Sequence, residues 1–202
     1  MDRQKDGIRR MIMKRLAVFA SGSGTNFEAI AQSCADGRID AQVVLLVCDN
    51  PKAGALDRAD RLGIPTFTFV PKTYYDKSEY EGQILQRLQA AEIDLICLAG
   101  YMRIVGTTLL DAFQDRIINI HPALLPSFKG AHGIRDAFEY GVKVFGVTIH
   151  YVDHTLDGGR IIAQRSFEYY GSDINEVEAR IHSIEHELYP ETIQKLIEEN
   201  KI

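Results

Sequence analysis

The sequence predicts an α/β fold, namely a single doubly wound, mostly parallel sheet with an antiparallel C-terminal hairpin and a long C-terminal helix. Short continuous apolar runs, typical of parallel strands covered on both faces, alternate with segments of helical periodicity through most of the chain. After residue 143 the pattern changes to two strand-like segments joined by a glycine-containing loop, followed by one extended helical stripe. These observations favour helices on both faces of one sheet.

The parallel part of the sheet is expected from apolar and β-branched runs. These runs predict strands over residues 16–20, 41–48, 66–70, 94–99 and 116–120. Helical periodicity predicts helices that begin at Phe27, cover residues 53–62 and cover residues 80–91. This alternation of strand and helix predicts a doubly wound α/β sheet.

The C-terminal part has a different organisation. Residues 127–133 form a loop long enough to be a flap over a site, and a short helix is expected over 134–140. Residues 143–152 alternate in polarity, which predicts a half-exposed antiparallel strand, and residues 160–168 form the return strand. The last helix starts with a capping box from Asp173 to Glu176.

A glycine-rich turn follows the first strand. In S-G-S-G-T-N over residues 21–26 the glycines allow a tight turn, and the N–H groups that begin the next helix attract an anion. Phe27 stands where a dinucleotide fingerprint needs its third glycine, and the Gly-Lys-Ser/Thr of a nucleotide-triphosphate loop is absent. We therefore expect a seat for a single phosphate, with an ordinary strand-to-helix turn as the alternative.

A polar pair ends the strand over residues 116–120. Pro122 stops that strand, and Asn119 and His121, two positions apart, point to the same face. An amide that donates to an oxyanion beside an imidazole that carries a proton suits attack on a carbonyl. The alternative is a buried histidine satisfied by a neighbour, with Asn119 serving a turn.

A carboxylate in a later loop completes the candidate set. Asp157 precedes two glycines and could accept a hydrogen bond from an imidazole, which would orient the ring and stabilise its protonated form. Turn chemistry is the alternative explanation for Asp-Gly. Residues 22–26, 100–105 and 119–121 follow three different strands, and the carboxyl ends of such strands form the ligand crevice of an open α/β sheet.

The composition argues against a nucleic-acid-binding protein and against a membrane protein. The 202 residues are 46% hydrophobic and 25% charged with a net charge of −5, and no basic cluster follows the first fifteen residues, so we expect no nucleic-acid partner. Three widely spaced cysteines suit a reducing compartment, and no apolar run approaches a membrane span, so we expect a cytoplasmic protein. Residues 1–13 are expected to form a flexible extension and residues 14–202 a single domain.

Five segments together carry a specific resemblance. They are S-G-S-G-T-N over 21–26, L-A-G-Y-M-R-I over 98–104, I-N-I-H-P-A-L-L-P over 118–126, G-V-T-I-H-Y-V-D-H-T-L-D-G-G over 146–159 and R-I-H-S-I-E-H-E-L-Y-P over 180–190. In these segments the chain resembles the phosphoribosylglycinamide formyltransferase family, which has a Rossmann-like fold. The resemblance implies transfer of the formyl group of 10-formyltetrahydrofolate to the amine of 5-phosphoribosylglycinamide, in de novo purine biosynthesis. It also implies that no metal takes part and that the protein is a monomer or a homodimer.

The resemblance assigns roles to individual residues. Asn119 and His121 would stabilise the oxyanion, His121 would protonate the departing folate nitrogen, and Asp157 would raise the basicity of His121. The substrate phosphate would be held by Gly24, Thr25 and Asn26, and the glycinamide by Pro122, His182 and Glu185. The pocket for the folate would be lined by Lys77, Met102, Arg103, Ile104, Val105, Asn119, Asp153, His154, Thr155, Leu156 and Asp157.

Several alternatives remain open from the sequence. Formyltetrahydrofolate hydrolase and methionyl-tRNA formyltransferase share this core, but they would need a regulatory or a tRNA-binding domain for which we find no sequence. His182-Ser183-Ile184-Glu185-His186 fits H-x-x-E-H, the inverted zinc-protease helix, although no third ligand is evident. A domain that only binds a phosphosugar is the third alternative.

Overall fold

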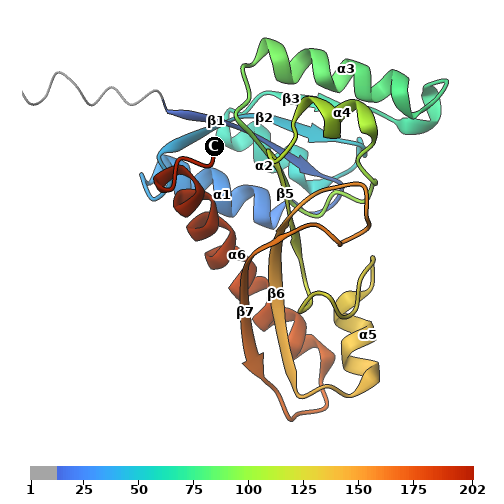
Figure 1. Ribbon diagram of the computed structural model, residues 1–202, viewed down its shortest axis with the longest axis vertical. Coiled ribbons are helices and arrows are strands. Elements are labelled where there is room, and N and C mark those ends of the chain that lie inside the picture. Colours follow the sequence, from blue (N-terminus) through green and yellow to red (C-terminus); the bar gives the residue numbers. More distant parts are fainter. Residues whose placement is uncertain (1–12) are drawn as a thin grey trace, which may run out of the picture.

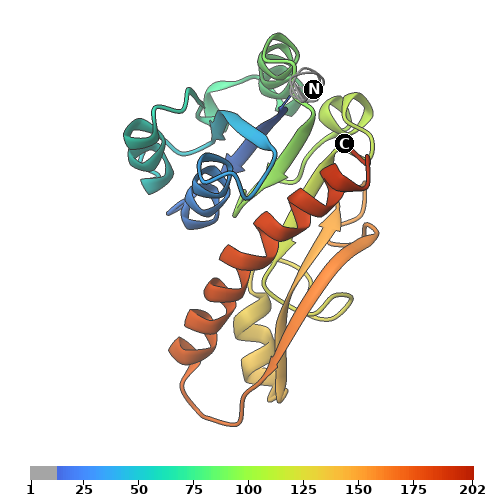
Figure 2. The same ribbon diagram turned by 90° about the vertical axis from the view of Figure 1, so that its left-hand side faces the viewer.

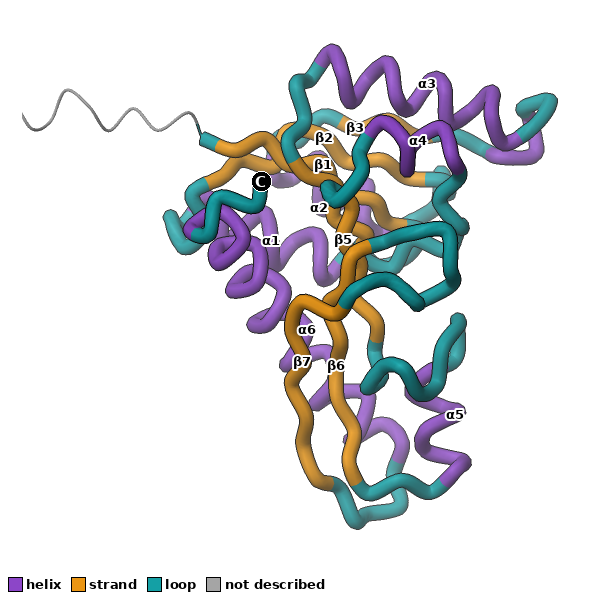
Figure 3. Tube along the Cα trace, viewed as in Figure 1, coloured by secondary structure: helices purple, strands orange, loops and turns teal. Residues whose placement is uncertain are grey.

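Strands from both halves of the chain form one sheet in the computed structural model, which describes residues 13–202 (Figures 1 and 3). The sheet has seven strands in the order β3-β2-β1-β4-β5-β6-β7. They are β1 Lys14–Ala20, β2 Ala41–Cys48, β3 Thr66–Thr68, β4 Leu95–Leu98, β5 Ile117–His121, β6 Val144–Tyr151 and β7 Ile161–Glu168. Strands β1 to β5 are parallel, and β6 and β7 are antiparallel additions. This agrees with the predicted fold class.

Helices cover both faces of the sheet. They are α1 Thr25–Ala35, α2 Gly54–Leu62, α3 Lys77–Ala90, α4 Thr107–Ala112, α5 Gly133–Tyr140 and α6 Ile174–Glu198, with the 3₁₀ turn η1 Pro71–Thr73. Alternate residues of β1 enter different cores: Val18 packs in a cluster with residues of α1 and α6, and Phe19 packs in a cluster with residues of α3 and α4. Both faces of β1 are thus buried, which explains its continuous apolar sequence.

The molecule is elongated, and its two ends contain different elements. In Figures 1 and 2, β1 to β4 and helices α1 to α4 form one end, and the long strands β6 and β7 with α5 form the other. Helix α6 runs diagonally past the sheet and packs against α1, α5 and both antiparallel strands. This helix therefore connects the two ends of the molecule.

The antiparallel strand β6 differs from its prediction as a half-exposed strand. All its residues except Val144 are buried, including Thr148 and His150. The reason is its position: β6 lies between β5 and β7 and is packed against α6. The alternating exposure is found instead on β7, the edge strand.

Other boundaries also differ from the sequence pattern. The third strand is confined to Thr66–Thr68, because Pro71 starts a 3₁₀ turn soon afterwards. Helix α4 was not predicted, since a helix this short has no clear periodicity. Asp173 caps α6 through the N–H of Asn175, one position earlier than a capping box would use. The predicted extension over residues 1–13 lies, apart from Met13, outside the described residues.

Candidate active site

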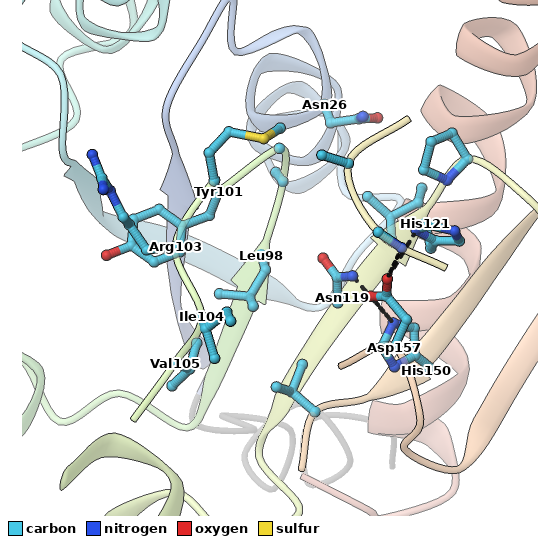
Figure 4. Close-up of a pocket in the computed structure, with 18 of the residues that line it drawn as sticks. Asn26, Leu98, Tyr101, Arg103, Ile104, Val105, Asn119, His121, His150 and Asp157 are labelled. Atoms are coloured by element: carbon cyan, nitrogen blue, oxygen red, sulfur yellow. Dashed lines mark hydrogen bonds and ion pairs between the residues drawn. The ribbon is translucent and has the colours of Figure 1, made fainter. Parts of the chain in front are cut away.

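The strand order places a crevice between β1 and β4. From β1 the chain continues to β2 and β3 on one side, and β4 then pairs with the opposite side of β1, which makes this the topological switch point of the sheet. A cavity of about 520 Å³ lies there, lined by residues that follow β1, β4 and β5 (Figure 4). The polar residues predicted at three separate strand ends therefore face one cavity.

Gly24 shapes the glycine-rich loop over residues 21–26, where α1 starts. It adopts φ +76°, and a Cβ at this position would lie 2.6 Å from the Cβ of Ala55, so only glycine fits. Thr25 and Asn26 then begin the helix, with their N–H groups at its positive end. Residues 22–26 all line the cavity, so this end of it suits an anion.

His121 and Asp157 lie side by side in the site (Figure 4). His121 Nε2 is 2.8 Å from the carbonyl oxygen of Phe128, and because a carbonyl only accepts, Nε2 carries hydrogen. In the neutral ring Nδ1 is therefore the basic atom, and it lies 3.6 Å from Asp157 Oδ2. The imidazole is only 3% exposed, so solvent does little to screen the interaction between this ring and the carboxylate.

His150 fixes the orientation of Asn119. The His150 Nδ1–H donates to the carbonyl of Tyr151 at 2.8 Å, which leaves Nε2 to accept from Asn119 Nδ2 at 3.1 Å. Burial lowers the pKa of His150, which keeps the ring neutral and able to accept. The second hydrogen of the Asn119 amide remains available for a developing oxyanion.

The flap over residues 127–133 is attached to the same two side chains. Besides the contact of Phe128 with His121, the Gly130 N–H donates to Asp157 Oδ2 at 2.8 Å. Gly133 packs so close that an added Cβ would lie 3.2 Å from His121 Nε2. The loop over residues 127–133, whose length predicted a flap, thus lies against the candidate catalytic groups.

Helix α6 supplies polar groups next to this glycine-rich loop. Glu185 is 4% exposed, and its Oε2 accepts from Asn26 Nδ2 and contacts His182 Nδ1, each at 3.0 Å. The hydrogen bond with Glu185 raises the pKa of His182. Asn26 Oδ1 is buried and has no hydrogen-bond partner among residues 13–202, so it is free to accept from a ligand.

Two irregular segments form the remaining wall. Residues 100–105, after β4, and residues 153–157, after β6, line the cavity and carry exposed apolar side chains. Met102 is 67% exposed, Ile104 68% and Leu156 56%. An apolar wall of this kind suits a flat organic ring better than a second ionic group.

The structure brings all but one of the predicted site residues to this cavity. Lys77 is the exception: it begins α3, and its Nζ lies 3.8 Å from Glu81 Oε1, outside the lining. The sequence pattern did not single out Asp49, Gly130 or the carbonyl of Phe128, because their contacts depend on long-range folding.

The zinc-helix alternative has little structural support. Within residues 13–202 no cluster of three or more histidine, cysteine or acidic side chains is arranged to hold a metal ion. His182 and Glu185 of that motif bond to each other, and Glu185 also accepts a hydrogen bond from Asn26. In the same part of the chain no helix combines the length and apolar character needed to cross a membrane.

Comparisons with known proteins all identify formyl transferases as relatives of this chain. The family model described as formyl transferase matches residues 14–193. This chain belongs to the formyl transferase family. A member from Bacillus subtilis named phosphoribosylglycinamide formyltransferase is 50% identical over 186 residues, which cover 92% of this chain and 95% of that protein.

Solved structures of formyl transferases have the same fold. The crystal structure of glycinamide ribonucleotide transformylase 1 from Geobacillus kaustophilus superposes with a TM-score of 0.89 at 51% identity, covering 91% of this chain and 98% of the other. Phosphoribosylglycinamide formyltransferase from Bacillus halodurans superposes with a TM-score of 0.88 at 49% identity, covering 91% and 95%.

Proposed function

We propose that this formyl transferase moves the formyl group of 10-formyltetrahydrofolate to the amine of 5-phosphoribosylglycinamide. The products are formylglycinamide ribonucleotide and tetrahydrofolate, in de novo purine biosynthesis. Relatives at 50% and 51% identity carry the corresponding names. The single observation that carries the proposal is a cavity shared by Asn119, His121, Asp157 and the N-terminus of α1. We also propose a single formyltransferase domain over residues 14–202, of which the family model matches residues 14–193.

Binding would use the two contrasting ends of the cavity. The phosphate lies on the N–H groups of residues 24–26, where the helix dipole favours an anion. Glu185 and His182 face the glycinamide portion, together with Pro122. The folate ring lies against residues 102–105 and 153–157, whose exposed apolar side chains match its flat faces.

The chemistry follows from the positions of three side chains. The amine attacks the formyl carbon, and the oxygen that becomes negative accepts from the free Asn119 N–H and from protonated His121. Collapse of the tetrahedral intermediate breaks the bond to the folate nitrogen, which takes a proton from His121. Asp157 accepts the proton released by the attacking amine, through water, and balances the charge on the imidazolium.

Hydrolysis of the same folate is the less favoured alternative. It would need only a water molecule as acceptor, whereas this cavity extends from the catalytic residues to a phosphate-type seat at Gly24. Because the three groups would serve either acceptor, the phosphate seat is what distinguishes transfer from hydrolysis.

A spectroscopic assay of folate release tests the proposed function. Release should depend on phosphoribosylglycinamide and should be far slower with water or with methionyl-tRNA as acceptor.

His121→Ala should lose several orders of magnitude in kcat with the fold intact, and Thr25→Ala should mainly raise the KM for the phosphorylated substrate. Equal release without the acceptor would contradict the proposal.

A further inference from the structure

Residues 100–105 form a wall of the cavity without regular secondary structure. They connect β4 to the loop before α4, and all six line the cavity. A segment that is neither helix nor strand lacks an internal hydrogen-bond ladder, so its shape depends on contacts with its surroundings. Two residues outside the cavity, Ser21 and Asp49, supply such contacts.

Ser21, at the end of β1, holds the first half of the segment. Its N–H donates to the carbonyl of Gly100 at 3.0 Å, and its Oγ accepts from the Met102 N–H at 2.8 Å. Ser21 directly precedes the phosphate loop but does not line the cavity. The contact with Gly100 is made by the backbone N–H of Ser21 and would remain in Ser21→Ala, whereas the contact with Met102 depends on the hydroxyl.

Asp49, at the end of β2, holds the second half. Arg103 Nε donates to Asp49 Oδ2 at 2.7 Å, and the carboxylate side chain is only 4% exposed. Its other oxygen, Oδ1, is buried without a hydrogen-bond partner in the described part of the chain. An incompletely paired buried carboxylate costs free energy of folding, so stability alone does not explain this residue.

We propose that Asp49 and Ser21 are positioning residues for the folate wall. Asp49 acts through Arg103 and Ser21 acts through Met102, and together they hold residues 100–105 in the shape that receives the cosubstrate. The inference deepens the proposed function and rests on it for the identity of the ligand. Neither residue touches the cavity, so neither takes part in the chemical step.

The isosteric change Asp49→Asn tests the proposal, since it removes the charge and keeps the shape. We expect the KM for 10-formyltetrahydrofolate and the Kd for tetrahydrofolate, measured by calorimetry, to rise about tenfold, the effect of losing one charge-assisted hydrogen bond. The kcat and the KM for phosphoribosylglycinamide should stay within about twofold of wild type. Ser21→Ala should show the same split between the two substrates.

A double-mutant cycle identifies the route of the effect. In an Arg103→Gln background, Asp49→Asn should have no further effect on folate affinity, because its partner is already lost. Glu187→Gln, which breaks an exposed ion pair with Arg165 at 3.1 Å, is the matched control and should change nothing.

Three results would overturn the inference. They are unchanged folate affinity in Asp49→Asn, equal loss for both substrates, and additive effects in the cycle. Failure of wild type to formylate phosphoribosylglycinamide would overturn the proposed function instead, and calorimetry with tetrahydrofolate would still test the role of Asp49.

Discussion

The two buried histidines of the site have opposite tautomers, each set by one backbone carbonyl. Phe128 holds hydrogen on Nε2 of His121, and Tyr151 holds hydrogen on Nδ1 of His150. The basic nitrogens left over lie 3.6 and 3.7 Å from the two oxygens of Asp157. One ring is thereby prepared to take a proton, and the other is kept as an acceptor for Asn119.

Removal of the Asn119 amide should slow the chemical step. Asn119→Ala should lower kcat by about 10²–10³, the usual cost of losing one oxyanion donor. His150→Ala should cost less, and it should add little to Asn119→Ala, because His150 acts through that amide. Single-turnover rates of the three variants check this. Full additivity would show that His150 has a separate role.

His182 should make the stability of the folded protein depend on pH. Its pKa is raised from 6.5 in the folded state, so its contribution to stability is complete below that value and is lost as the pH rises through the folded pKa. Urea unfolding of wild type and His182→Gln should therefore differ more at about pH 5.5 than at about pH 9. The difference should be small, because the ring is half exposed. A difference that grew with pH would contradict the assignment.

Between neighbouring helices, a buried carboxylate joins α3 to α4. Glu81 of α3 is 3% exposed, and its Oε1 accepts from the N–H of Gly106, which caps α4, at 2.7 Å. Burial raises the pKa of Glu81, although the bond from Gly106 opposes that shift. The contact lies at the N-cap of α4, the residue that directly follows the cavity-lining segment 100–105.

Substitutions at Glu81 should separate its hydrogen bond from its charge. Glu81→Ala leaves a buried N–H unpaired and should lower the free energy of unfolding by about 1–3 kcal/mol. In wild type the folded state binds the proton more tightly, so stability falls as pH rises above about 4.5. Glu81→Gln does not titrate and should become more stable relative to wild type over that interval. Thermal unfolding against pH checks this, with exposed Asp111→Asn as control.

Across the whole molecule, α6 connects parts that are distant in sequence. Its fully buried Tyr189 places a hydroxyl 3.0 Å from the carbonyl of Leu98 and 3.1 Å from that of Ile118. These carbonyls belong to β4 and β5, where the two strands approach the cavity. The C-terminal helix therefore supports the strand ends that carry the site.

The hydroxyl of Tyr189 should matter for global stability. Tyr189→Phe leaves buried carbonyls without this donor and should cost about 1–3 kcal/mol, or several degrees in Tm for a chain of this size. Calorimetric unfolding measures the change. Tyr170→Phe removes an exposed hydroxyl that contacts Glu168, and it should leave the Tm unchanged. Equal effects at both positions would contradict the assigned role.

Local pattern determined much of this protein. Apolar runs predicted the parallel strands, and proline and glycine placed Asn119, His121 and the phosphate loop at strand ends. These features follow from backbone restrictions that act within a few residues, so the sequence alone contains them. Because parallel strand ends meet at one edge of a sheet, the cavity could also be expected before its geometry was known.

Only the tertiary structure decided the features that depend on distant partners. Strand β6 is buried on both faces because β5, β7 and α6 surround it, which its alternating sequence does not reveal. Likewise, Lys77 lies outside the cavity, and Asp49 and Gly130 contact the site through residues far along the chain. Burial and hydrogen-bond partnership are properties of the packed molecule, and no periodicity in a single segment encodes them.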